Sequence, residues 1–148
     1  MIEYALTTNS PEETENAGKE LANTAKENNI NFVAMYGGLG AGKTAFVRGM
    51  ADVLAKGACV SSPTYAIVNE IYPENSDTPA IFHFDMYRVE SEDDLDSIDF
   101  DNYFLRGALM VCEWSENIEF ALPEHYLRVE IEKTGECSRL ISVKEIKS

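Results

Sequence analysis

The stretch of the sequence best suited to chemistry is the glycine-rich run at residues 37–44, which ends in Lys and Thr. It reads GGLGAGKT and matches the phosphate-binding pattern G-x-x-x-x-G-K-[ST] in full. Glycines let backbone N–H groups turn inward around an anion, and a helix that follows presents its positive end to the same phosphates. On this pattern Lys43 meets the β- and γ-phosphates of a nucleotide, and the hydroxyl of Thr44 meets Mg²⁺. The candidate nucleotide-binding residues here are Gly37, Leu39, Gly40, Ala41, Gly42, Lys43 and Thr44.

Two carboxylates are candidates to hold the Mg²⁺ that accompanies a nucleotide. Asp85 follows the apolar run 81–84, and Glu113 follows the apolar run 109–112. If both runs are strands parallel to the one before the glycines, both carboxylates lie beside the phosphates, where Mg²⁺ takes oxygen ligands. With Lys43 they are the candidate catalytic residues, and with Thr44 the candidate metal ligands. Spacing leaves open which carboxylate contacts the metal and which orients water. The alternative for either is that it caps the next turn.

Several single residues have two readings each. Thr64, in a Ser-Pro-Thr sequence, is a candidate sensor of the γ-phosphate or an ordinary turn residue. Arg88 and Arg139 could each meet a phosphate or form a salt bridge in this acidic chain, and Arg139 is retained as a nucleotide-binding candidate. Trp114 either belongs to the core or plugs the site. His83 is expected to be a hydrogen-bonded core residue rather than a base.

The elements that must position these residues follow from hydrophobic periodicity and capping signals. Ser10, Pro11 and Glu13 indicate a capped helix start. Strands are expected over 2–6, 32–36, 65–72, 80–84, 108–112, 126–132 and 139–143, and helices over 11–27, about 43–56 and, as short acidic pieces, 91–105. This pattern predicts the α/β class: a P-loop NTPase-like three-layer fold with a central mixed sheet and a C-terminal antiparallel hairpin, as a single domain over 1–148.

Charge and cysteine content narrow the functional classes. The 148 residues include 12 Lys and Arg against 26 Asp and Glu, a net charge of −14. Such a surface repels nucleic acid, which excludes bulk DNA binding and favours protein partners. Neither a membrane span nor a secretion signal is present in the sequence. The three cysteines, Cys59, Cys112 and Cys137, suggest buried or half-buried thiols in a reducing cytosol.

Four segments in order resemble the TsaE (YjeE) family: GGLGAGKT at 37–44, SPTY at 62–65, HFDMYR at 83–88 and EW at 113–114. The resemblance covers nearly the whole chain. It implies a cytoplasmic, Mg²⁺-dependent ATPase that is weak alone and acts with TsaB and TsaD in the threonylcarbamoyladenosine (t6A) modification of tRNA position 37. It further implies that the isolated chain is a monomer that leaves tRNA to its partners.

The resemblance also implies residue roles. Thr44 and Glu113 would lie on the Mg²⁺ side, Asp85 would be a catalytic or metal-shell carboxylate, Thr64 a switch-like threonine, and Trp114 a residue near the nucleotide or a partner. The chain departs from the family's common pattern at Gly38, Ala45, Asp99, Asn102 and Ser115. None of these replaces a proposed phosphate or metal ligand, so they bear on partner contacts alone.

Three other classes remain as alternatives. A small-molecule kinase would use the same loop, but this chain has few arginines to close on phosphoryl groups. A GTPase would need an N-K-x-D element, which the sequence lacks. A non-catalytic, nucleotide-gated binding module would use Asp85 and Glu113 only as structural residues.

Overall fold

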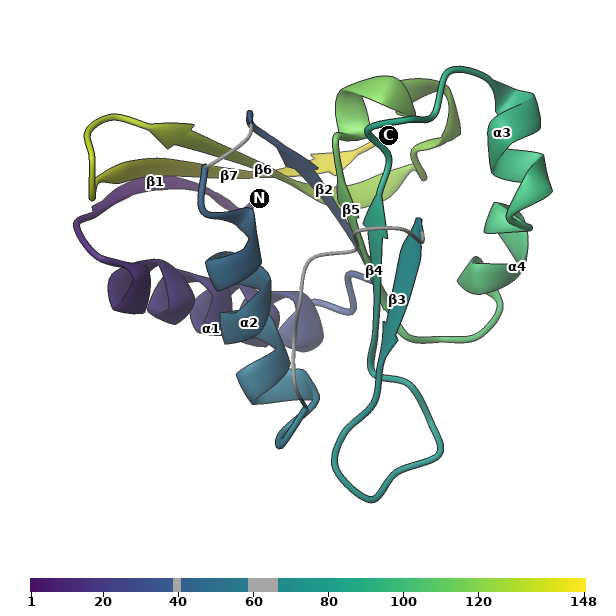
Figure 1. The fold of residues 1–148 in the computed structure, drawn as a ribbon, viewed down its shortest axis with the longest axis horizontal. Coiled ribbons are helices and arrows are strands. Elements are labelled where there is room, and N and C mark those ends of the chain that lie inside the picture. The colour runs from purple at the N-terminus through teal and green to yellow at the C-terminus, as the bar shows by residue number, and fades with distance from the viewer. Residues whose placement is uncertain (39–40, 59–66) are drawn as a thin grey trace.

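A seven-stranded sheet with helices on both faces forms the centre of the computed structural model, which describes residues 1–38, 41–58 and 67–148 (Figure 1). None of the helices in these ranges combines the length and the apolar character that a membrane-spanning helix needs. The elements are β1 (Glu3–Thr8), α1 (Pro11–Glu27), β2 (Phe32–Tyr36), α2 (Lys43–Leu54), β3 (Val68–Ile71), β4 (Ile81–Asp85), α3 (Glu92–Ser97), α4 (Phe100–Phe104), β5 (Leu109–Glu113), the 3₁₀ turns η1 (Ser115–Asn117) and η2 (Glu119–Ala121), β6 (His125–Lys133) and β7 (Arg139–Lys147).

The strands lie in the order β1-β7-β6-β2-β5-β4-β3. The four neighbours β6, β2, β5 and β4 are parallel, so their carboxyl ends meet at one edge of the sheet. The remaining pairs, β1 with β7, β7 with β6, and β3 with β4, are antiparallel. The predicted mixed sheet with a closing hairpin is therefore confirmed.

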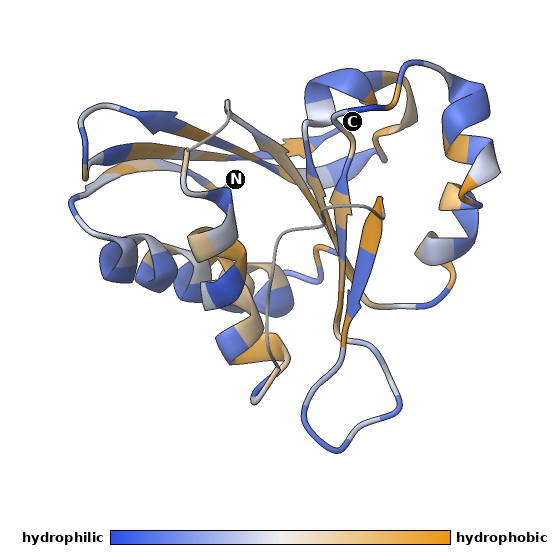
Figure 2. Ribbon diagram, viewed as in Figure 1, coloured by the Kyte–Doolittle hydropathy of each residue, from blue (hydrophilic) through white to orange (hydrophobic). Residues whose placement is uncertain are grey.

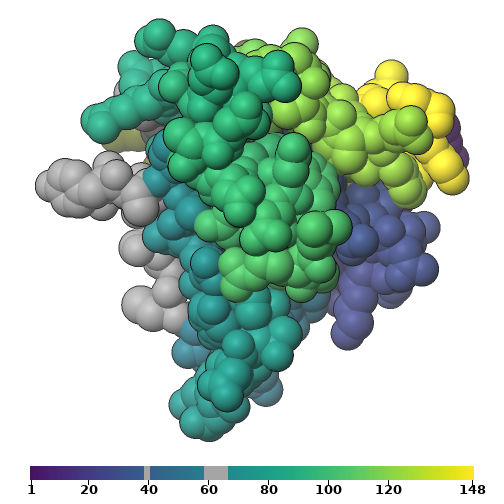
Figure 3. All heavy atoms as spheres, turned by 90° about the vertical axis from the view of Figure 1, so that its right-hand side faces the viewer, coloured from purple at the N-terminus to yellow at the C-terminus, as the bar shows by residue number. Residues whose placement is uncertain are grey.

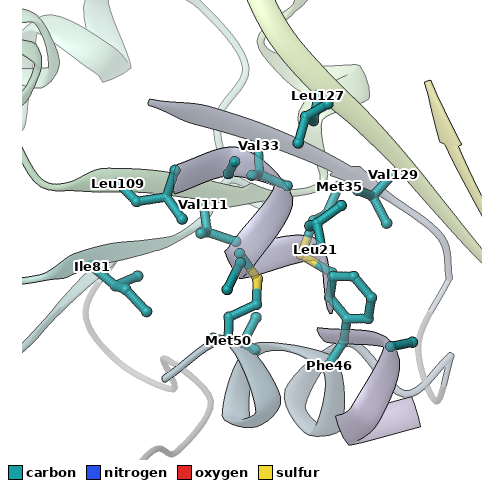
Figure 4. Packing of buried hydrophobic residues seen from close by; sticks show 14 of the residues in the cluster. Leu21, Val33, Met35, Phe46, Met50, Ile81, Leu109, Val111, Leu127 and Val129 are labelled. Carbon is teal, nitrogen blue, oxygen red and sulfur yellow. The ribbon is translucent and has the colours of Figure 1, made fainter. Parts of the chain in front are cut away.

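The three predicted layers are a helical layer, the sheet and a second helical layer, with one buried cluster on each face of the sheet. Along β2, Val33 and Met35 belong to one buried cluster, while Phe32, Ala34 and Tyr36 belong to the other, because successive side chains of a strand point to opposite faces. Helices α1 and α2 cover the first face, where Phe46 and Met50 pack near Met35 (Figure 4). Helices α3 and α4 cover the second face and form much of the surface on that side (Figure 3).

Helices α1 and α2 approach each other closely at two glycines. A Cβ atom at Gly18 would lie 2.0 Å from the Phe46 carbonyl oxygen, and one at Gly49 would lie 1.9 Å from the Glu15 carbonyl oxygen. No larger residue fits at either position without a backbone shift. This contact sets the position of α2, and with it the loop that precedes α2.

The start of α1 follows its capping sequence with one difference. Ser10 Oγ accepts a hydrogen bond from the Glu13 N–H at 3.1 Å, and Pro11 occupies the first turn, as predicted. The Glu13 carboxylate, however, accepts from the Asn9 N–H at 3.0 Å rather than from the N–H of Ser10. The carboxylate therefore accepts from the N–H of the residue before the N-cap, whereas in a standard capping box it accepts from the N–H of the N-cap itself.

Some boundaries differ from the sequence-based expectation. Helix α2 ends at Leu54, two residues before the predicted end at Lys56, because the chain turns there and the Lys56 carbonyl accepts from the Glu74 N–H at 3.0 Å. Strand β3 begins at Val68, and Tyr65 and Ala66 lie outside the described residues. The loop from β3 to β4 is mostly hydrophilic, as its composition indicated (Figure 2).

Candidate functional site

The glycine-rich loop, residues 37–44, connects the carboxyl end of β2 to the start of α2, as the sequence predicted. Gly37 has φ +140°, and a Cβ there would lie 2.4 Å from the Ile131 carbonyl oxygen of β6, so only glycine fits. Gly42 has φ +92° and is the N-cap of α2, where it supplies no side-chain cap. The first turn of α2 contains no acidic residue. The positive end of α2 is therefore not neutralised by a carboxylate of its own first turn, which favours an anion there.

Lys43 is a buried cation with three neighbours at this site. Its side chain is 6% exposed, and Nζ donates a hydrogen bond to the Gly37 carbonyl at 2.8 Å. Nζ also lies 3.6 Å from Glu113 Oε1 and 4.5 Å from the centre of the Trp114 ring. Because a buried charge must be paired, these contacts hold the lysine against the carboxylate.

Asp85 and Glu113 end the neighbouring parallel strands β4 and β5 and are register partners. The expectation that both carboxylates lie at the carboxyl edge of the sheet is borne out, and Glu113 lies 3.6 Å from Lys43 of the glycine-rich loop. Their surroundings differ, since Glu113 is buried and Asp85 is half-buried. Asp85 Oδ1 accepts from the Tyr87 N–H at 3.0 Å, so Asp85 does cap the next turn with one oxygen.

His83 is buried, as expected, but its partner is a residue of the site. Its Nε2 is paired with Glu113 Oε2, a contact that joins β4 to β5. Within the described part of the chain, its Nδ1 has no hydrogen-bond partner. The sequence did contain a signal for the contact of His83 with the site. His83 lies two residues before Asp85, so both side chains are on the same face of the strand.

Trp114 lies at the site and not in the centre of the core. It is half-buried with φ +59°, and its ring centre is 4.9 Å from that of Tyr87, which is 56% exposed. The turn is fixed by the hydroxyl of Ser115, which donates to the Cys112 carbonyl at 2.7 Å. Asn117 Nδ2 donates to the Met86 carbonyl at 3.0 Å and so joins the segments that follow β4 and β5.

Arg139, at the start of β7, reaches the glycine-rich loop from 98 residues away. Its Nε donates to the Ala41 carbonyl at 3.1 Å, and its Nη1 donates to the carbonyl of Ser138 at 2.9 Å. The hairpin thus places a guanidinium beside Gly42. Arg88, the other candidate arginine, is exposed three residues after the end of β4.

A cavity of about 410 Å³ lies beside the loop. Gly37, Gly38 and Ala41 line one side, and Glu130 and Glu132 of β6 contribute to the other. A second cavity, of about 360 Å³, lies at the opposite end of the parallel strands, and no carboxylate is among the described residues that line it. In the described ranges, no group of three or more His, Cys, Asp or Glu side chains could hold a metal ion alone.

Three candidate nucleotide-binding residues lie outside the described residues, and the expected burial of Cys137 is wrong. Leu39, Gly40 and Thr64 lie outside the described residues, as does Cys59. Cys112 is buried as expected, and burial raises the pKa of its thiol well above the usual value. Cys137 is exposed rather than buried or half-buried, because it lies in the turn of the β6–β7 hairpin.

The fold and the arrangement of loop, helix and strand ends define a P-loop NTPase-like α/β protein. The crystal structure of YdiB from Bacillus subtilis superposes on the whole chain and on 89% of YdiB, with a TM-score of 0.70 and 27% identity. A family model described as threonylcarbamoyl adenosine biosynthesis protein TsaE matches residues 8–141. The chain belongs to the TsaE family.

Individual relatives support the same assignment. The tRNA threonylcarbamoyladenosine biosynthesis protein TsaE of Bacillus subtilis is 35% identical over 133 residues, which cover 90% of this chain and 80% of the relative. The TsaE protein of Rickettsia typhi is 34% identical over 140 residues, which cover 94% and 93%. The TsaE protein of Rickettsia prowazekii is 36% identical over 140 residues, which cover 93% and 92%.

Proposed function

We propose that this chain binds ATP together with Mg²⁺ on the glycine-rich loop and hydrolyses it as part of tRNA t6A biosynthesis. The observation that carries the proposal is the contact between Lys43 and Glu113. A buried lysine at the start of α2 lies 3.6 Å from a buried carboxylate at the end of a parallel strand. A cation for phosphate and a carboxylate for metal therefore face each other at the positive end of a helix.

The loop suits the phosphates of a nucleotide. Gly37 has φ +140° and Gly42 has φ +92°, backbone conformations that residues with a Cβ rarely adopt. Helix α2 has no side-chain cap, and its positive end and Lys43 attract the same anion. Arg139, held by the Ala41 carbonyl, adds a second positive group at the loop.

The oxygen groups of the site suit Mg²⁺ that arrives with a nucleotide. Mg²⁺ in such sites is held by one or two carboxylates and a hydroxyl, with the remaining positions taken by phosphate oxygens and water. Thr44, Glu113 and Asp85 are residues of this kind. When bound, the ion neutralises charge on the β- and γ-phosphoryl oxygens.

The chain's own residues would then act by position and charge. Lys43 holds the phosphoryl oxygens after it leaves Glu113, and the backbone N–H groups at the start of α2 stabilise the same oxygens. Glu113 is the better candidate for the metal side because Oε1 already faces Lys43. Asp85, with one oxygen used in its turn, is the candidate to orient the attacking water.

The partner proteins follow from family membership and charge. We propose that the chain acts in the cytoplasm with TsaB and TsaD and is a monomer when isolated. A net charge of −14 disfavours direct contact with tRNA, which the partners would hold instead.

The decisive experiment measures ATP turnover with and without TsaB–TsaD, together with formation of modified tRNA. Lys43→Ala should abolish turnover and t6A formation, because a charge-assisted contact worth about 1.5–3 kcal/mol is lost in the ground state and more in the transition state. Lys56→Ala, an exposed lysine beyond the far end of α2, is the matched control and should behave as the wild type. Hydrolysis by Lys43→Ala at the wild-type rate would refute the proposal.

A non-catalytic, nucleotide-gated module is the alternative that the structure supports with a specific contact. Asp85 caps a turn, and Glu113 is held between Lys43 and His83, so both carboxylates have structural contacts. This alternative requires that ATP binding, and not turnover, supports t6A formation.

A further inference from the structure

His83 is a buried titratable side chain that the function proposed above does not use. It lies in β4, is fully buried, and its Nε2 is paired with Glu113 Oε2. Among the described residues its Nδ1 has no partner. A buried imidazole with one polar contact, directed at a carboxylate of the site, calls for an explanation beyond packing.

The carboxylate of Glu113 is contacted from two directions. His83 holds Oε2, and Lys43 lies 3.6 Å from Oε1. The two contacts together fix the rotation of the carboxylate plane. One oxygen is directed to the interior of the sheet and the other to the glycine-rich loop.

The proton of His83 has one favourable position. A buried imidazole N–H without an acceptor is costly, so a proton is favoured on the ring nitrogen that faces an acceptor. Because Nδ1 faces no acceptor among the described residues, the proton belongs on Nε2, where Glu113 accepts it. His83 thus acts as a donor that occupies one of the two oxygens of Glu113.

We propose that His83 is a positioning residue that makes Glu113 present a single oxygen, Oε1, to the metal. This inference rests on the function proposed above. Without the imidazole, the buried carboxylate would be able to turn both oxygens toward Lys43 and keep the lysine from the phosphates. Hydrogen-bonded partners of metal-binding side chains are worth about 10–100-fold in metal affinity or activity.

Two substitutions at His83 separate this role from simple packing. His83→Phe keeps a flat ring but has no N–H, whereas His83→Gln has an amide N–H that can reach the same oxygen. His125→Phe is the matched control, because the chain has two histidines and His125 also pairs through Nε2 with a glutamate, Glu145, at 2.7 Å. His125 begins β6 at the end of the parallel strands opposite the glycine-rich loop.

The first measurement is the affinity for Mn²⁺ in the presence of a non-hydrolysable ATP analogue, by electron paramagnetic resonance. We expect Mn²⁺ affinity to fall about 10–100-fold in His83→Phe, and to stay near the wild-type value in His83→Gln and His125→Phe. Binding of the analogue without metal should be weaker in His83→Phe, where Glu113 keeps Lys43 from the phosphates, and unchanged in His83→Gln and His125→Phe. Equal loss of Mn²⁺ affinity in His83→Phe and His83→Gln, or no loss in either, would overturn the inference.

The second measurement needs no nucleotide. ¹⁵N NMR of the imidazoles in the wild type should show a proton on His83 Nε2, and Glu113→Gln should change the His83 signals but not those of His125. A wild type with the His83 proton on Nδ1 would overturn the inference even if a His83 variant fails to fold. A wild type that binds no Mn²⁺ with the analogue refutes the proposed function itself, whereas normal wild-type binding with an unaffected His83→Phe refutes only the role of His83.

Discussion

Asp85 and Glu113 are directly opposite each other at the ends of two parallel strands, yet they have different environments. Glu113 is 7% exposed and contacts Lys43 and His83, while Asp85 is half-buried and accepts the Tyr87 N–H. Parallel pairing brings both carboxyl groups to the edge where β2 delivers the glycine-rich loop. The difference in burial and partners, rather than in position along the strand, separates their proposed roles.

Replacing each carboxylate by its amide should reveal the different roles of Asp85 and Glu113. We expect Glu113→Gln to lower ATP turnover about 10²–10³-fold and to raise the Mg²⁺ concentration needed for half-maximal rate. Asp85→Asn retains an acceptor for the Tyr87 N–H and should lower turnover with a smaller change in Mg²⁺ requirement. Glu92→Gln, on the exposed side of α3, is the control. If the double variant Asp85→Asn/Glu113→Gln keeps its turnover, the non-catalytic alternative is correct.

Trp114 should report ligand binding, because it is the one tryptophan of the chain and lies 4.5 Å from Lys43 Nζ. Phosphate at the loop would draw Lys43 away from the indole, so ATP with Mg²⁺ should cause a saturable change in tryptophan emission. Lys43→Ala should remove the response. Calorimetric binding of ATP without any change in emission would contradict the proposed movement of Lys43.

The close contact of α1 and α2 predicts a stability effect. Gly49→Ala would place Cβ 1.9 Å from the Glu15 carbonyl oxygen, and such overpacking costs about 1–3 kcal/mol. The higher helix propensity of alanine offsets about 0.5–1 kcal/mol of this. Urea unfolding should therefore show Gly49→Ala less stable than the wild type. Gly38→Ala, whose Cβ would have no described residue within 4 Å, should unfold as the wild type does.

The Glu70–Arg106 pair predicts a pH dependence of stability. Hydrogen bonds from the Arg106 guanidinium lower the pKa of Glu70 below its usual value of 4.5. The pair therefore stabilises the folded state above pH 4.5, and this contribution is lost as pH falls through the lowered pKa. Since the pair is partly exposed, we expect the wild type to exceed Glu70→Gln by at most about 1 kcal/mol at pH 7. A difference that stays constant down to pH 2.5 would contradict this assignment.

The charge of the chain predicts its behaviour toward tRNA. With a net charge of −14, the isolated protein should give no gel shift with tRNA at physiological salt. A shift at sub-micromolar protein without TsaB–TsaD would show that the chain carries its own tRNA surface.

Much of the fold was predictable because its signals are local. The alternation of apolar residues and the cap at Ser10 indicated the strands and α1, and their order indicated a mixed sheet with a closing hairpin. The end of α2 was less predictable, because the contact of Lys56 with Glu74 depends on where a distant loop returns. The exposure of Cys137, in contrast, follows from the strands expected over 126–132 and 139–143, which place it in the turn between them.

By itself, the sequence determined the glycine-rich loop between a strand and a helix, and the carboxylates at two strand ends. Those features depend on contiguous residues, whose backbone preferences act within a few positions. Only the tertiary structure decided that His83 contacts Glu113, that Glu113 faces Lys43, and that Arg139 reaches Ala41. Such contacts depend on strand order and register, which bring together side chains far apart in the chain and which no local pattern specifies.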